Sequence, residues 1–211
     1  MAPSVSEPNI HHRKPAPRSA ADEPPSLTGR AASDLHFIRA VMQRSTRFMP
    51  LPGWGITAVG GIGAVTAVAA RNLSGMAWAA AWCGAAALAL LVAVAVSSRQ
   101  SREAGKSIFV GSYRAFWLSL WPAFGAAIPL SAALLWNDQW QLLAGSWLLL
   151  YGTGVSAASQ HTVPQVAWLG RGFMILGVPA LFLPWPTLFM AAGFGGLHLV
   201  IGIWITRSDL G

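Results

Sequence analysis

Residues 164–205 read PQVAWLGRGFMILGVPALFLPWPTLFMAAGFGGLHLVIGIWI. The stretch holds two apolar runs, each of about 20 residues, the length at which an α-helix crosses a bilayer. A short turn, Leu183-Pro184-Trp185-Pro186, joins them. Arg171 and His198 are the only basic or acidic side chains well inside any apolar run of the chain. The stretch therefore predicts a membrane hairpin whose two polar positions mark where a mechanism would reside.

Composition extends this prediction to the rest of the chain. The 211 residues are 54% hydrophobic and only 10% charged, with a mean hydropathy of +0.50, whereas a soluble domain carries about 25% charged residues. The first apolar run begins at Leu51, so we expect no secretory signal peptide. The single cysteine, Cys83, gives neither a disulfide nor a metal pair. We expect an all-α polytopic membrane protein.

The apolar runs divide into a bundle of six transmembrane helices, at about 51–70, 74–97, 115–136, 140–159, 164–184 and 186–206. Tryptophans near the ends of the spans, such as Trp54 and Trp204 at one side and Trp78 and Trp136 at the other, fit interfacial belts. The last pair of spans leaves an alternative open, because the Pro-Trp-Pro turn is also compatible with a broken or re-entrant segment.

The first 49 residues differ from the spans. Residues 1–33 contain six prolines and few large apolar side chains, which predicts a disordered tail. On a helix, residues 34–49 place Leu35, Ile38 and Met42 on one side and Arg39 and Arg47 on the other, which predicts a basic amphipathic helix on the membrane surface. This helix either anchors the first span or docks a partner or the lipid surface.

Basic residues predict the orientation. Seven Lys and Arg lie in the first 50 residues and four more in the basic loop at 98–114, so 11 of the 14 lie on one side of the predicted bundle. The positive-inside rule places that side, with both termini, in the cytoplasm. The net charge of +7 is then a topology signal. We expect no nucleic-acid partner, because no basic groove interleaved with aromatic residues is present.

Four polar residues fall at one depth in the predicted bundle. Thr57, Tyr151, Arg171 and His198 each lie six to eight residues from the cytoplasmic end of a span, or about 9–12 Å at ~1.5 Å per residue. They predict a polar layer facing a shared interior. Two interpretations stay open: Arg171 snorkels to the phosphate layer while His198 bonds to a neighbouring helix, or the layer binds a small solute or a proton. Because no span holds a carboxylate, an anionic or neutral solute is favoured over a cation.

Small residues form one face on each of two spans. Gly53, Gly60 and Ala64 share a face of the first span, and Gly195 and Gly202 share a face of the last. Such faces allow helices to approach closely in lipid. We expect ordinary contact inside one bundle; a sliding or dimerising surface, and hence a homo-oligomer, is the alternative.

One enzyme class merits comparison. Ser146 in the fourth span and His198 in the sixth resemble the serine and histidine of rhomboid intramembrane proteases. That family has a Gly-x-Ser-Gly element, whereas Trp147 follows this serine, and the two residues differ in predicted depth by about 9 Å. A protease is therefore a remote alternative. The chain contains no phosphate-binding loop, zinc motif or acidic pair, so we expect no catalytic residue, cofactor or metal.

Four short segments resemble small six-span bacterial membrane proteins of unknown function: Asp34-Leu35-His36-Phe37-Ile38-Arg39, Pro52-Gly53-Trp54-Gly55, Tyr151-Gly152-Thr153-Gly154 and Gly193-Phe194-Gly195-Gly196-Leu197-His198. The resemblance covers about residues 34–207 and implies a bacterial inner-membrane setting without carrying over any site residue.

Taken together, these patterns favour a non-enzymatic membrane component that engages a partner complex or lipid through residues 34–49 and 98–114. The alternative is a small transporter or channel-like carrier for an anionic or neutral solute, with its site at Arg171 and His198.

Overall fold

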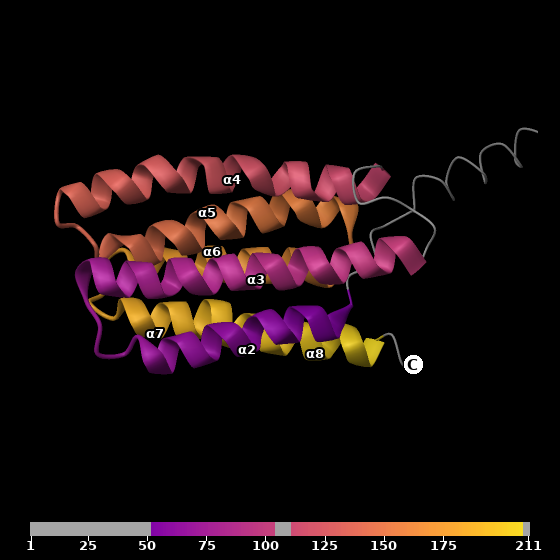
Figure 1. The fold of residues 1–211 in the computed structure, drawn as a ribbon, viewed down its shortest axis with the longest axis horizontal. Helices are drawn as coiled ribbons and strands as arrows, with labels where there is room; N and C mark the ends of the chain where they lie inside the picture. Colours follow the sequence, from indigo (N-terminus) through magenta and orange to yellow (C-terminus); the bar gives the residue numbers. More distant parts are fainter. Residues whose placement is uncertain (1–51, 104–110, 209–211) are drawn as a thin grey trace, which may run out of the picture. The chain divides into compact units, whose positions relative to one another are not determined.

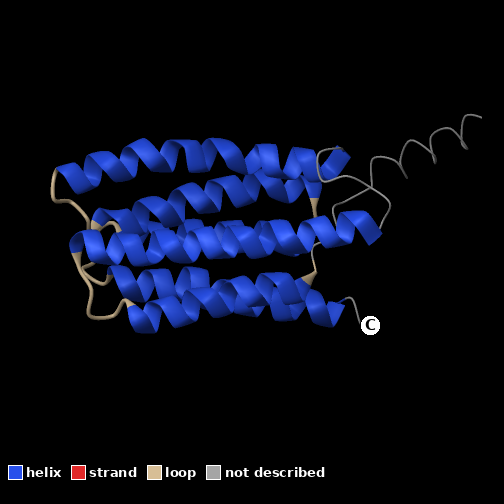
Figure 2. Ribbon diagram, in the orientation of Figure 1, coloured by secondary structure: helices blue, strands red, loops and turns tan. Residues whose placement is uncertain are grey.

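A computed structural model describes residues 52–103 and 111–208 of the chain. The predicted tail at 1–33, the predicted surface helix at 34–49 and residues 104–110 of the basic loop lie outside the described residues. The described part of the chain is all-helical and contains no β-strand (Figure 2).

The helices run alternately up and down, and their connections alternate between two ends (Figure 1). Their bounds are α2 Gly53–Ala69, α3 Gly75–Glu103, α4 Gly111–Trp136, α5 Leu142–Ala158 with a following 3-10 turn at Ser159–His161, and α6 Gln165–Ala180. A continuous C-terminal rod follows, made of α7 (Pro186–Met190), the π-helical segment η2 (Ala191–Leu197) and α8 (His198–Ser208). The Pro-Trp-Pro stretch is thus a turn between two helical segments.

Within the described residues, four helical segments are long and apolar enough to cross a membrane: Gly75–Glu103, Tyr113–Trp136, Leu142–His161 and Pro186–Ser208. Helix α2 is apolar but has only 17 residues, and α6 has 16 residues, with Arg171 among them. The chain therefore has the helices of a membrane protein.

Helices α3 and α4 are longer than the spans predicted at those positions. Residues 98–103 continue α3, and residues 111–114 begin α4, so both ends of the predicted basic loop are helical. The prediction ended each span where the apolar residues end. Arg, Gln and Glu are good helix formers, however, so a helix can continue beyond its apolar residues. Gly111, where α4 begins, has φ +64°, a backbone conformation that favours glycine.

The first and last helices pack together through the two small-residue faces. A Cβ added to Gly60 would lie 2.8 Å from the backbone nitrogen of Leu199, and one added to Gly195 would lie 3.4 Å from the Cα of Ala64. Thr57 packs against Gly202 at the same interface. The prediction of ordinary contact inside one bundle is confirmed, since the two faces cover each other.

Helix α6 packs mainly against α5, and α4 covers α5 from the other side. The α5–α6 contact is close because glycines meet there: a Cβ on Gly170 would lie 3.0 Å from the carbonyl oxygen of Gly152. Helix α3 contacts α2 and few residues of α4. The first turns of α3 nevertheless reach the middle of the bundle, through Trp78 and Trp82.

A tryptophan cluster fills that region. Its members are Trp78 and Trp82 of α3, Trp140 just before α5, and Trp147 of α5. The Trp78 ring is 0% exposed and stacks on Trp147 with a centroid distance of 5.8 Å, and its Nε1–H donates a hydrogen bond to Thr187 Oγ1 at 2.8 Å. Trp78 thus lies near the end of α3, as predicted, but it is buried inside the bundle and does not face outward as an interfacial residue would. Trp136, 89% exposed, and Trp54, 56% exposed, do face outward.

Candidate functional site

The structure joins two of the four predicted site residues. Tyr151 of α5 and His198, the first residue of α8, form a hydrogen bond with 3.0 Å between Tyr151 Oη and His198 Nε2. The pair links α5 with α8. His198 is 2% exposed, so this bond forms where no water competes and where an unpaired group is costly.

Aromatic rings surround the pair. Phe173 of α6 lies 4.7 Å from Tyr151 and 5.3 Å from His198, measured between ring centroids. Phe194 of η2 lies 5.0 Å from Tyr151 and stacks on the imidazole at 5.9 Å with 16° between the ring planes. These distances are those of favourable aromatic pairs. We call Tyr151, Phe173, Phe194 and His198 the aromatic box. Four segments meet there: α5, α6, η2 and α8.

His198 Nδ1 is buried and makes no hydrogen bond of good geometry within the described part of the chain. The carbonyl groups of Gly193 and Phe194 are the backbone acceptors that lie toward the imidazole. Carbonyl neighbours favour the tautomer with its proton on Nδ1, in which the Tyr151 hydroxyl donates to Nε2.

The aromatic box lies directly after a π-helical segment. Residues Ala191–Leu197 form seven π-helical residues, and His198 follows them. Such runs are rare and are frequently found at functional sites. Three of these residues are glycines, and a Cβ on Gly193 would lie 3.0 Å from Cε1 of Phe173. The absence of a side chain at Gly193 therefore lets η2 approach α6 closely.

Arg171 is not part of this arrangement. Its side chain is exposed, and its guanidinium lies over the Trp168 ring, 4.8 Å from the centroid. It belongs to a stripe of exposed residues on α6 that continues with Ile175 and Val178 and, just after the helix, with Phe182. At spacings of three and four, these positions share the face of α6 that points away from α5. The structure therefore separates Arg171 from His198, although the similar predicted depth of these two residues had indicated a shared interior.

Thr57 is also apart from the pair. Its hydroxyl donates to the carbonyl oxygen of Gly53 at 3.0 Å, one turn earlier in α2, and its side chain packs against Gly202. The hydroxyl is thus satisfied locally. Of the four predicted residues, the structure joins Tyr151 and His198, while Thr57 lies at a contact between helices and Arg171 is exposed.

The residues of the remote protease alternative do not meet. His198 bonds to Tyr151 through Nε2, and Ser146 hydrogen-bonds to neither imidazole nitrogen. Five residues of α5 separate Ser146 from Tyr151, or about 7.5 Å along the helix axis. Across residues 52–103 and 111–208, no three His, Cys, Asp or Glu side chains come together as a metal site requires.

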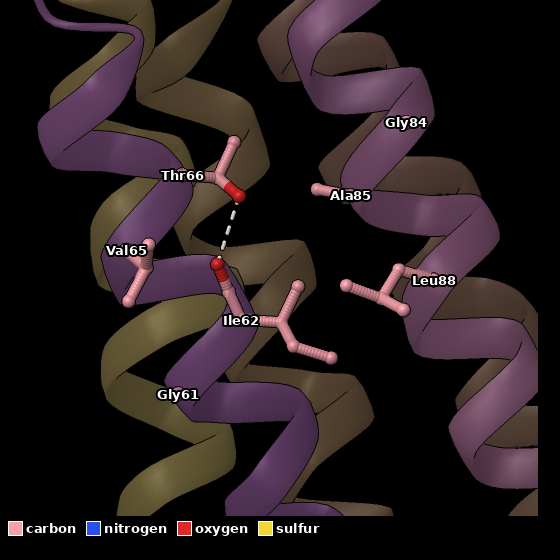
Figure 3. Close-up of a pocket in the computed structure, with 7 residues that line it drawn as sticks. All are labelled: Gly61, Ile62, Val65, Thr66, Gly84, Ala85 and Leu88. Carbon is pink, nitrogen blue, oxygen red and sulfur yellow. Dashed lines mark hydrogen bonds between the residues drawn. The ribbon is translucent and has the colours of Figure 1, made fainter.

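A groove of about 460 Å³ lies between α2 and α3, away from the aromatic box (Figure 3). Ile62 and Val65 of α2 and Ala85 and Leu88 of α3 line it. Its hydroxyl group, on Thr66, already donates to the carbonyl oxygen of Ile62 at 2.8 Å (Figure 3). The groove therefore offers apolar contact and is lined by none of the four predicted site residues.

Sequence reasoning missed Phe173 and Phe194. One signal was available for Phe194, because it precedes His198 by four residues and such positions share a helix face. The sequence gives no comparable signal for Phe173, which reaches the box from another helix.

Loss of the Tyr151 hydroxyl is expected to destabilise the protein. In Tyr151→Phe the buried Nε2 of His198 loses its partner, and we expect the free energy of unfolding to fall by about 1 kcal/mol. Unfolding in mixed SDS micelles measures this change. The hydroxyl of Thr153, exposed on the same helix, supplies the control Thr153→Val, with an expected effect within about 0.5 kcal/mol.

A double-mutant cycle tests the same bond further. Tyr151→Phe combined with His198→Phe is expected to cost less than the sum of the single changes, because removing both partners leaves no buried polar group unpaired. Additive costs would show that the hydroxyl and the imidazole do not stabilise each other.

No protein-family model matches the chain, and no curated protein or solved structure was found to be similar to it.

Proposed function

We propose that this chain is a non-enzymatic, six-span component of a bacterial inner membrane that engages a partner complex or lipid through its basic cytoplasmic face. In this proposal both termini are cytoplasmic, and α2 and α6 cross the bilayer beside the four longer helical segments. The basic residues at 98–114 and the predicted surface helix at 34–49 form the engaging face.

The length of α3 is the observation that supports this proposal best. Its 29 residues span about 43 Å, whereas the hydrocarbon core of a bilayer is about 30 Å thick. The surplus turns lie at the C-terminal end, where Arg99 and Arg102 are exposed. Arg114, near the start of α4, is exposed as well. A rigid helical extension thus carries positive charge beyond the apolar layer, where it attracts an acidic protein surface or anionic headgroups.

The connections at the opposite end are short. They comprise the residues between Ala69 and Gly75, between Trp136 and Leu142, and between Ala180 and Pro186. They leave little surface for a partner, so the end that carries Arg99 and Arg102 is the better candidate (Figure 1).

We expect the double variant Arg99→Gln/Arg102→Gln to lose most of the proteins or anionic lipids that co-purify with the chain from native membranes. The matched control is Arg71→Gln, an exposed arginine at the opposite end of the bundle, which should retain them. Quantitative mass spectrometry of the purified material measures both. Equal losses from both variants, or retention by the double variant, would contradict the proposed face.

Deletion of residues 34–49 addresses the other part of the face. The proposal requires this deletion to release the same co-purifying components as the double variant. Release of the partner by the deletion alone would restrict the face to the N-terminal segment.

The alternative, a small carrier for an anionic or neutral solute, is supported by one feature: the π-helical segment that precedes the buried His198. Its polar site would consist of Tyr151 and His198 without Arg171, which is exposed. Solute flux into liposomes that falls in His198→Phe would favour the carrier.

A further inference from the structure

Arg171 is an exposed cation beside an exposed indole on an otherwise apolar stripe. Trp168 is 57% exposed, and the stripe continues with Ile175 at 72%, Val178 at 53% and Phe182 at 80%. Arg171 forms no ion pair within residues 52–103 and 111–208, and the acidic residues of those ranges, Glu103 and Asp138, lie at helix ends. The positive charge therefore needs an anion from outside the described residues.

The position of Arg171 along α6 fits the depth of a headgroup layer. Six residues separate it from Gln165, the first residue of the helix, which is about 9 Å along the axis. Side chains on a helix lean toward its N-terminus, and the guanidinium accordingly lies over Trp168, three residues earlier. The arginine side chain thus points to the N-terminal end of α6, which faces the lipid phosphates in the proposed topology, and tryptophan is the residue that prefers that layer.

We propose that Arg171 and Trp168 form a binding site for the phosphate of an anionic phospholipid, with the acyl chains along Ile175, Val178 and Phe182. A guanidinium binds phosphate through paired N–H donors, and its stacking on the indole holds it in one orientation. The site rests on the proposed crossing of the bilayer by α6, but it does not depend on which partner engages the basic cytoplasmic face, because it lies on the side of α6.

Two other occupants fit less well. A second copy of the chain, related by a two-fold axis along the membrane normal, would place two Arg171 side chains at one depth, where like charges repel strongly in lipid. A protein partner would need an acidic residue of its own inside the bilayer, which is costly. A phospholipid brings its anion to this depth at no such cost.

The test measures lipid retained by the purified protein. The protein is exchanged into micelles that contain equal amounts of phosphatidylglycerol and phosphatidylcholine, and native mass spectrometry counts the bound lipids. For Arg171→Gln we expect about a fivefold loss of bound phosphatidylglycerol, which corresponds to about 1 kcal/mol. The matched control Arg207→Gln, an exposed arginine at the end of α8, should keep the wild-type amount. Thermal unfolding of each variant confirms that it is folded.

Further variants separate charge from geometry. Arg171→Lys keeps the charge but loses the planar stack, so it should retain an intermediate amount of phosphatidylglycerol. Trp168→Leu should also give an intermediate loss. Retention by Arg171→Gln at the wild-type level would overturn the proposal, and so would a loss in Arg171→Lys as large as in Arg171→Gln.

Two more arms identify the source of the phosphate. Displacement of phosphatidylglycerol by millimolar inorganic phosphate would show a site for the free ion and overturn the lipid assignment. Loss of a co-purified protein, with unchanged lipid, in Arg171→Gln would show that the stripe is a protein contact. Loss of lipid in Arg171→Gln, with partners retained, supports the proposal whether or not the Arg99→Gln/Arg102→Gln variant keeps its partners.

Discussion

Replacing Trp78 with Ala is expected to lower the free energy of unfolding by about 3 kcal/mol, the lower end of the range for a buried tryptophan. The ring is 0% exposed, stacks on Trp147, contacts Trp82 and Trp140, and donates to Thr187. Its loss would leave a cavity at the junction of α3, α5 and α7. The lower end of the range applies because a tryptophan ring that leaves the bundle enters lipid and not water, so little hydrophobic transfer free energy is lost. The dispersion contacts of the ring inside the bundle are still lost.

The matched control is Trp136→Ala. Trp136 ends α4 and is 89% exposed, so its replacement should change stability by less than about 0.5 kcal/mol. Unfolding in mixed SDS micelles measures both variants, and Trp78→Phe separates the hydrogen bond from the ring. Equal losses for Trp78→Ala and Trp136→Ala would mean that the tryptophan cluster does not stabilise the bundle.

A single methyl group at Gly63 is expected to cost about 2 kcal/mol. A Cβ there would lie 2.6 Å from the carbonyl carbon of Phe194 and 2.9 Å from the nitrogen of Gly195. Both neighbours are backbone atoms, so no side chain can rotate away, and α2 must separate from η2 instead. The same shift would move Phe194, and with it one wall of the aromatic box.

Gly61 provides the control on the same helix. A Cβ at Gly61 would meet nothing within 4 Å, so Gly61→Ala should be neutral or slightly stabilising, because alanine favours a helix. The same unfolding measurement ranks the two variants. A Gly61→Ala loss that equals the Gly63→Ala loss would show that helix propensity, and not the α2–η2 contact, governs this region.

Sequence patterns predicted the helical segments of the described part because apolar run length and the Pro-Trp-Pro turn are local properties. They also predicted that Gly53, Gly60 and Gly195 lie at contacts between helices, because small residues on one face of a membrane helix allow close packing of the helix backbones. The helical residues 98–103 of α3 and 111–114 of α4 were not predicted, because a hydrophobicity pattern shows where the apolar residues end and not where the helix ends.

The candidate site was less accessible to sequence reasoning. Counting residues from the predicted span ends places Tyr151, Arg171 and His198 at a similar depth. Such a count carries no information on which way a side chain points around its helix. The rotation of α6 turns Arg171 outward, and the π-helical segment sets the rotation of His198. A strict period of 3.6 residues does not describe the C-terminal rod, because seven of its residues follow a wider turn.

The pairing of α2 with the C-terminal rod has a consequence for biosynthesis. Gly63 and its neighbour Gly195 are far apart in the sequence, so at about 5–20 residues per second the ribosome adds the second on the order of 10 s after the first. During that interval the glycine face of α2 lacks the helix that covers it in the folded bundle. Assembly of this bundle is therefore completed by its last segment, and truncation after α6 would leave the first helix without its main partner.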